Sequence, residues 1–450
     1  MYFEGDRSMS EEILIQNGLV VTGDEKGRIY ENGYVKFSDG KIKDIGSGTP
    51  RNSSDTVIDA SGCVVIPGLI TAHTHLYGIL LKGASLNIEP PTDFAQVLQR
   101  VWWPVDSALS IEDAYASALS ASADMLKNGS TLFADTYSGP NSIEGSLEAI
   151  ARGTKEVGIR GIIAFEITER NNPEEAERGL REGINFVNSI KNDELLSGMM
   201  SIHASFTVGD EIVQKAVEEA KKLDIPITVH TSEGLVDLYH NLETTGERTV
   251  ERLDRLGVLG PRTVLAHCVH VNGHEMDLIA KSKSSVAHNP MSNMLNAVGV
   301  APVTAMLERG ITVGLGNDGW IYDPFENMRC AMTIHRLASG NPSAIGPEQI
   351  FRMATLDGAK CYGLEKKIGS LEKGKLADIV ILDGSEVPTP LNEKSVVGHL
   401  LNTFTGSDVR DVFVNGIHTV KDRKLVLTTE EHVARVSRES ATNLWSHLEK

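Results

Sequence analysis

The stretch VVIPGLITAHTH, residues 64–75, decides the fold, because an apolar run that ends in polar residues is typical of a buried strand in a parallel sheet. The same pattern recurs as STLFADTY, RGIIAFEIT, MMSIHASFT, IPITVHTSE, TVLAHCVHV, SSVAHNPMS and ITVGLGNDG. Segments with helical apolar spacing separate these runs, at residues 111–128, 173–190, 210–223, 249–256 and 302–309. Eight strand candidates alternating with helices predict an α/β protein built on a (β/α)8 barrel, the TIM barrel.

Short β-type runs flank the predicted barrel on both sides. Residues 10–66 hold such runs with the turn pairs Asn17-Gly18 and Asp39-Gly40, which predict hairpins of a small antiparallel sheet. After the barrel, VRDVFVNGIHTV contains the turn pair Asn415-Gly416. Neither end is long enough for a sandwich alone, so we expect both to form one composite β-sandwich. The predicted segments are sandwich strands at 10–66, the barrel at 67–369, further sandwich strands at 370–425 and a C-terminal helix at 426–450.

The composition excludes several classes of function. The 450 residues include 43 Lys and Arg against 61 Asp and Glu, a formal net charge of −18. Such a charge repels phosphate backbones and anionic lipids, so we expect neither nucleic acid nor membrane as a partner. The 4 cysteines are scattered without a C-x-x-C pair, which suits a reducing cytoplasm, and no apolar run approaches the roughly 20 residues of a membrane span. We expect a cytoplasmic protein whose function lies in a pocket.

Several ionisable residues fall at the ends of predicted barrel strands, where this fold builds its active sites. His73 and His75 end the first strand, and both imidazoles point the same way because alternate side chains of a strand share a face. His230 ends the fifth strand and Asp318 the eighth. Singly, Asp318 is interpreted as a helix N-cap and His230 as a core histidine. Together the four residues predict a catalytic site for Zn²⁺ or Fe²⁺ with a position open for water.

Further candidates lie on the same rim of the predicted barrel. His267 ends the sixth strand, where it can hydrogen-bond metal-bound water or substrate. His203 ends the fourth strand and His288 the seventh, and for both a substrate contact competes with a role in packing the rim. His270 is interpreted as a surface group. Substrate specificity is expected to depend on loop side chains such as Trp102, Trp103, Phe206, Asn293 and Trp320.

The sequence resembles the metal-dependent amidohydrolase superfamily over nearly its whole length. The likeness is carried by VIPGLITAHTH, HTSE, VLAHCVH, HNPMSN, GLGNDG and IGSLEKGKLADIVILD. Within the superfamily it is most similar to the TRZ/ATZ-like branch of chlorohydrolases and aminohydrolases, and there to the aminohydrolases called SsnA, through WWPVD at 102–106 and FEITERNN at 165–172. This resemblance implies Glu233 as proton donor, His267 as the group that orients water, and as metal ligands His73, His75, His230 and Asp318.

Two departures from the superfamily narrow the expected chemistry. Binuclear relatives use a carboxylated lysine at the end of the fourth strand, whereas this chain has SIHASFT there, so we expect one divalent metal ion. Zn²⁺ suits the ligands best, with Fe²⁺ and Mn²⁺ as alternatives. Relatives that deaminate adenosine-type thioethers hold the ribose with a glutamate near the first helix, where this chain has TDFAQVLQ. A free base or a small heterocycle is therefore expected rather than a ribosylated substrate.

The expected function is that of a metal-dependent aminohydrolase, a deaminase that hydrolyses an exocyclic amino group of a purine-like N-heterocycle and releases ammonia. A ring-opening amidohydrolase that acts on a cyclic amide or ureide is the first alternative, although such enzymes more usually need the bridged binuclear site. A catalytically silent scaffold is the second, and the full ligand set with Glu233 argues against it. We also expect a homo-oligomer, a dimer.

Overall fold

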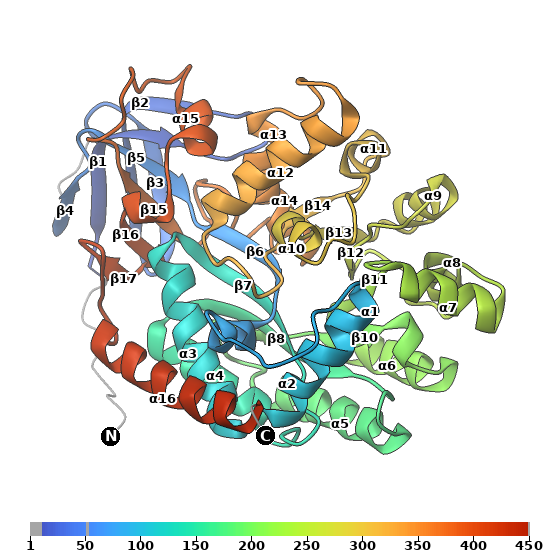
Figure 1. Cartoon of the computed structure of the whole chain (residues 1–450). Helices are drawn as coiled ribbons and strands as arrows, with labels where there is room; N and C mark the ends of the chain where they lie inside the picture. The colour runs from blue at the N-terminus through green and yellow to red at the C-terminus, as the bar shows by residue number, and fades with distance from the viewer. Residues whose placement is uncertain (1–10, 51–53, 449–450) are drawn as a thin grey trace.

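The computed structural model describes residues 11–50 and 54–448, and it contains a barrel with a second sheet beside it (Figure 1). Along the main path of the barrel sheet, each neighbouring pair of strands is parallel. This arrangement confirms the predicted (β/α)8 barrel. Its strands are β6 (Leu69–Thr74), β7 (Ser130–Tyr137), β8 (Arg160–Ile167), β10 (Met200–Ala204), β11 (Ile227–Thr231), β12 (Thr263–His267), β13 (Ser285–His288) and β14 (Val313–Leu315).

The segment after β14 returns to β6, because the backbone N–H of Asn317 donates to the carbonyl oxygen of His73 at 3.0 Å. Helices alternate with the strands and surround the barrel (Figure 1). Some of these helices begin at a side-chain cap, as where Ser110 and Asp113 form a capping box for α3. They are α3 (Ile111–Lys127), α4 (Ser146–Val157), α5 (Pro173–Ser189), α6 (Asp210–Leu223), α7 (Leu235–Thr245), α8 (Thr249–Arg255), α9 (Gly273–Ser282), α10 (Pro290–Leu295), α11 (Val303–Glu308), α12 (Pro324–Ser339), α13 (Pro347–Met353) and α14 (Leu356–Cys361).

The second sheet joins the two ends of the chain, as predicted. Strand β5 (Cys63–Pro67) pairs antiparallel with β15 (Ile379–Asp383), which brings the N-terminal and C-terminal strands into one sandwich-like domain. The domain has its own apolar core, which includes the buried side chains of Val35, Phe37 and Phe413. Its other strands are β1 (Ile13–Val21), β2 (Ile29–Ser38), β3 (Lys41–Ser47), β4 (Thr56–Asp59), β16 (Val409–Val414), β17 (Ile417–Lys421) and β18 (Lys424–Leu425).

The predicted antiparallel sheet also contains parallel pairs, which the sequence did not indicate. Strand β1 pairs parallel with β4 through its first half and with β5 through its second half. The pair Asn17-Gly18 lies between these halves and forms a bulge inside β1 rather than a hairpin turn, with Asn17 at φ 66°. The bulge lets one strand serve two partners in succession. Asp39-Gly40 and Asn415-Gly416 do form the predicted hairpin turns, with φ positive at all four residues.

The stretch that decides the fold is divided between the two domains. Its first half is β5 of the sandwich and its second half is β6 of the barrel, although the sequence suggested a single strand. The break is at Gly68, where an added Cβ would lie 1.9 Å from Oγ1 of Thr131. Only glycine permits this close approach, so the chain passes from one sheet to the other there.

A C-terminal helix and several short segments complete the molecule. The C-terminal helix α16 (Glu430–Leu448) lies against α3 (Figure 1). The indole of its Trp445 donates to the carbonyl of Leu80 at 2.8 Å. Within the described ranges, no helix is both long and apolar enough to cross a membrane. The remaining segments are η1 (Leu76–Leu81), α1 (Phe94–Val97), η2 (Leu98–Trp102), α2 (Trp103–Ala108), η3 (Ser205–Thr207), α15 (Val396–Asn402), η4 (Gly406–Asp408) and a short strand, β9 (Leu196–Gly198), that pairs with β8.

Candidate active site

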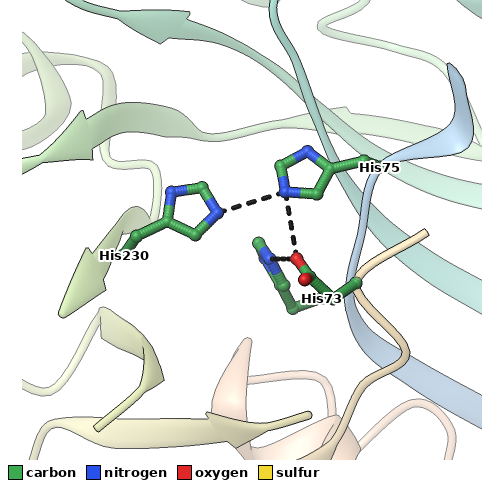
Figure 2. Close-up of side chains that lie close together, drawn as sticks. His73, His75 and His230 are labelled. Atoms are coloured by element: carbon green, nitrogen blue, oxygen red, sulfur yellow. Dashed lines mark hydrogen bonds and ion pairs between the residues drawn. The ribbon is translucent and has the colours of Figure 1, made fainter. Parts of the chain in front are cut away.

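Four predicted metal ligands converge at the C-terminal face of the barrel. One ligand atom from each of His73, His75, His230 and Asp318 lies within 4.8 Å of those of the other three. Oδ1 of Asp318 is 3.1 Å from Nε2 of His73 and 3.1 Å from Nε2 of His75. The three imidazoles point toward one another from β6 and β11, and Nε2 of His75 lies 3.1 Å from Nε2 of His230 (Figure 2).

The hydrogen bonds of these imidazoles show that the site fits a cation. Nδ1 of His75 donates to the carbonyl of Thr136 at 2.8 Å, and Nδ1 of His230 donates to the carbonyl of His203 at 2.6 Å. In the neutral imidazoles, each Nε2 then carries a lone pair, and the two lone pairs face each other. This arrangement is repulsive without a positive charge between them, and it is the usual way in which proteins orient histidine ligands to a metal.

Asp318 is held in place by its surroundings. Its other carboxylate oxygen, Oδ2, accepts a hydrogen bond from the hydroxyl of Ser292. Burial opposes ionisation of the carboxyl, but the neighbouring histidines, His267 first among them, hold the pKa of Asp318 well below its usual range. An ionised carboxylate beside three imidazoles is a ligand set that suits Zn²⁺.

Glu233 and His267 lie beside the metal ligands, as the resemblance implied. Nε2 of His267 is 3.5 Å from Oε2 of Glu233 and 3.7 Å from Oδ1 of Asp318. Burial raises the pKa of Glu233 to about 7, although the nearby His267 opposes the rise. Burial alone would lower the pKa of His267, but the carboxylates of Glu233 and Asp318 raise it to about 9. Glu233 can therefore hold a proton near neutral pH, which a general acid requires.

A cavity opens over this cluster. His203, Phe206, Trp102 and Trp103 line it, as does Phe94. The helical segment 94–108 supplies both indoles and contains a π-helical stretch, η2, a feature that is frequent at functional sites. The aromatic walls suit a planar ring.

Three predicted substrate contacts fall outside the cavity lining. Asn293 accepts from Nδ1 of His267 at 2.8 Å, so it orients that imidazole. His288 is buried, with its Nε2 2.9 Å from Nε2 of His335 on α12. Trp320 packs edge-to-face on Trp102, with ring centroids 5.7 Å apart. Each of the three therefore touches a neighbour of the site and does not itself form the cavity wall.

Glu166 is a cavity residue that the sequence reasoning missed. It lies one residue before the end of β8 and is 2% exposed, and its Oε1 is 3.8 Å from Nδ1 of His75 and 3.7 Å from Nδ1 of His230. A signal was present, since Glu166 stands at the end of a predicted barrel strand like the metal ligands. The ion pair of Asp106 with Arg170, 2.6 Å apart and buried, joins the two stretches WWPVD and FEITERNN, but the sequence alone did not show that they meet.

The cluster and cavity occur in a chain that is similar to known hydrolases. The chain is 34% identical over 440 residues to 5'-deoxyadenosine deaminase of Methanosarcina acetivorans. The aligned residues cover 96% of this chain and 98% of that protein. It is 33% identical over 438 residues to 5-methylthioadenosine/S-adenosylhomocysteine deaminase of Thermoanaerobacter pseudethanolicus, over 96% of this chain and 99% of that protein.

Two solved structures share the fold. An adenosine deaminase of Xanthomonas campestris with bound zinc has a TM-score of 0.87 and 24% identity, over 96% of this chain and 98% of that one. Atrazine chlorohydrolase TrzN of Arthrobacter aurescens TC1, complexed with zinc, has a TM-score of 0.85 and 23% identity, over 95% of this chain and 100% of that one.

The family description "Amidohydrolase family" matches residues 64–417, from β5 of the sandwich, through the whole barrel, to the first residue of β17. This range contains all four predicted metal ligands of the cluster, together with Glu233 and His267. The resemblance found in the sequence is thereby confirmed at the level of the superfamily. The chain belongs to the amidohydrolase family.

Proposed function

We propose that the protein is an aminohydrolase with one metal ion, which removes an exocyclic amino group from a purine-like heterocycle as ammonia. One observation carries the proposal: Glu233 and His267 stand beside the His/His/His/Asp cluster at a single aromatic cavity. Membership of the amidohydrolase family makes the chain a hydrolase of carbon–nitrogen bonds. The deaminase names of its relatives support the narrower reaction.

The proposed cofactor is a single Zn²⁺ held by His73, His75, His230 and Asp318. When bound, such an ion lowers the pKa of coordinated water from 15.7 to around 7, which supplies hydroxide at neutral pH. Strand β10 and the turn after it contain no lysine that could bridge a second ion. The zinc in the similar solved structures supports this choice of metal.

Each residue of the site then has a separate task. Asp318 accepts a proton from the attacking water, and the imidazole of His267, fixed by Asn293, orients that water. Glu233 protonates a ring nitrogen next to the carbon that is attacked. The ring becomes a better electrophile, and ammonia leaves after a second proton transfer.

The substrate is proposed to be an amino-substituted purine or a similar heterocycle. From TDFAQVLQ, the segment expected to bear a ribose-binding glutamate in thioether deaminases, only the apolar side chains of Phe94 and Leu98 line the cavity. Asp93, the one carboxylate there, instead caps α1 by accepting from the N–H of Gln96 at 2.9 Å. We expect bases to be better substrates than their nucleosides, and a panel with each base beside its nucleoside checks this.

The test is a comparison of Glu233→Gln with wild type, with zinc content, melting temperature and ammonia release measured on one preparation of each. The amide is nearly isosteric and Glu233 is not a ligand, so zinc should remain at one equivalent per chain. Loss of the acid should lower kcat by about 10²–10⁴-fold. Glu243→Gln, on the exposed face of α7, is the matched control. Wild-type turnover in Glu233→Gln would remove the residue from the mechanism, and two equivalents of zinc would refute the mononuclear site.

We also make predictions about the oligomeric state and the cellular location of the protein. We expect a homodimer, which sedimentation of the zinc-loaded chain would detect. We also expect a cytoplasmic location, in keeping with four buried cysteines that are all free thiols.

A further inference from the structure

We propose that the cavity selects substrates that bring a hydrogen-bond donor or a positive charge to Glu166, and that it rejects anionic ones. The inference rests on the proposed aminohydrolase function and adds the chemical class of the substrate. Glu166 is the last residue but one of β8, at the face of the barrel where the proposed metal ligands lie, and it lines the same cavity. Its position therefore brings it close to a ring bound over the cluster.

One carboxylate oxygen of Glu166 has no hydrogen-bond partner in the described part of the chain. Oε1 is buried and forms no hydrogen bond to any described residue. The ring nitrogens at 3.7 and 3.8 Å, Nδ1 of His230 and of His75, are too far for a hydrogen bond and already donate to backbone carbonyls. A buried acceptor without a donor is destabilising, and an N–H or O–H of a ligand removes that cost.

The positive charge nearest to this side of the cavity, the guanidinium of Arg170, is already paired with Asp106. Nη1 of Arg170 lies 2.6 Å from Oδ2 of Asp106, and Nη2 donates to the hydroxyl of Ser138 at 3.3 Å. The Arg170 side chain is 5% exposed and its guanidinium lies over the ring of Trp103. It is held by these contacts and cannot turn toward a ligand without leaving Asp106 unpaired.

The lining as a whole is acidic and aromatic. Among the described residues that form it, none is Lys or Arg, whereas Asp106, Glu166, Glu233, Asp237 and Asp318 all contribute. A phosphate or carboxylate on the substrate would find no lysine or arginine among the described residues of this lining, and it would lie beside these acidic side chains. A ring with a second amino group or a protonated nitrogen would instead satisfy Glu166 and lie against aromatic faces that attract positive charge.

The experiment compares binding of two ligand pairs to the zinc-loaded full chain by calorimetry. Adenine and diaminopurine differ by one amino group, and adenosine and adenosine monophosphate differ by one phosphate. Wild type should bind diaminopurine roughly tenfold more tightly than adenine, the effect of one hydrogen bond to a charged group, and should not bind the monophosphate. Glu166→Gln should lower the first ratio, because an amide oxygen is a weaker acceptor than a carboxylate. Glu174→Gln, an exposed carboxylate at the start of α5, should leave it unchanged.

Several outcomes would overturn the inference. These are a diaminopurine affinity no higher than that of adenine in wild type, binding of the monophosphate as tight as that of adenosine, or an unchanged ratio in Glu166→Gln. Loss of zinc from Glu166→Gln would instead assign the residue to holding His75 and His230. The wild-type pairs test the proposal even if the variant does not fold. Selective binding without ammonia release from any ligand would support this inference and refute the aminohydrolase function alone.

Discussion

Two residues of the site, His267 and Asp318, and Ser232, which precedes Glu233, have backbones in the left-handed region, at φ 70°, 56° and 46° respectively. This conformation is uncommon for residues other than glycine and costs on the order of 1–3 kcal/mol each. All three follow or end barrel strands, where packing on both sides fixes the turn. These backbone conformations direct the side chains of His267 and Asp318 at some cost in local stability.

The pKa of Glu233 leads to a prediction about pH. Burial raises that pKa to about 7, and a general acid works only while it carries its proton. The rate constant kcat/KM should therefore decrease as pH rises above about 7, because the free enzyme loses the acidic proton. Ammonia release measured from about pH 6 to about pH 9 checks this expectation.

The Glu233→Gln variant serves as the control for the pH profile. It should be slow at every pH and should lack the decrease above neutrality. A wild-type profile that stays flat up to about pH 9, or a decrease that persists in the variant, would assign the titration to another group.

At the scale of elements, the site depends on how closely the end of the barrel sheet approaches its first strand. Gly316 follows β14, and an added Cβ there would lie 2.2 Å from Oδ1 of Asn289 and 2.8 Å from the carbonyl oxygen of His73. The N–H groups of Asn317 and Asp318 reach the same carbonyl at 3.0 and 3.3 Å. The same close contacts therefore close the barrel and position His73 and Asp318.

Gly316→Ala should therefore lower both stability and metal content. The extra methyl group must move either Asn289 or the backbone of His73, and overpacking of this kind typically costs about 1–3 kcal/mol. A lower melting temperature together with less zinc per chain is the expected result. Gly398→Ala in α15 is the matched control, since nothing lies within 4 Å of its added Cβ, and alanine favours a helix. Full zinc content in Gly316→Ala would separate the closure of the barrel from the metal site.

At the scale of the whole molecule, the sandwich-like domain and the barrel are joined by buried polar contacts. Arg160 at the start of β8 pairs with Asp378 next to β15 at 3.3 Å, and both side chains are under 10% exposed. The carbonyl of Asp378 also accepts from the N–H of Gly68 at 3.0 Å. Separation of the domains would leave these charges and backbone groups without partners.

The isolated barrel, cut at Gly68 and Gly369, is accordingly expected to be insoluble or poorly folded. Removal of β5 and β15 would expose the apolar surface they cover, and it would leave Arg160 buried without its carboxylate. Solubility and a thermal melt of the fragment, beside the full chain, provide the measurement. A soluble fragment with one cooperative transition would show that the barrel folds without the sandwich.

The sequence by itself determined the barrel and the ligand cluster. Eight apolar runs of strand length allow few other folds, and parallel strands of a closed barrel bring their C-terminal ends to one face. For that reason His73, His75, His230 and Asp318 could be placed together although they are far apart in the chain. The spacing of apolar residues and the position at a strand end were sufficient to place these four residues, because the regular geometry of a strand determines where its side chains point.

The tertiary structure alone decided what depends on loops and on contacts between distant segments. It paired His288 with His335, turned Asn293 toward His267, and placed Glu166 in the cavity. It also divided one apparent strand at Gly68 between two sheets. Loop conformations and the twist of a sheet arise from packing across the whole molecule, so the pattern of neighbouring residues does not contain them.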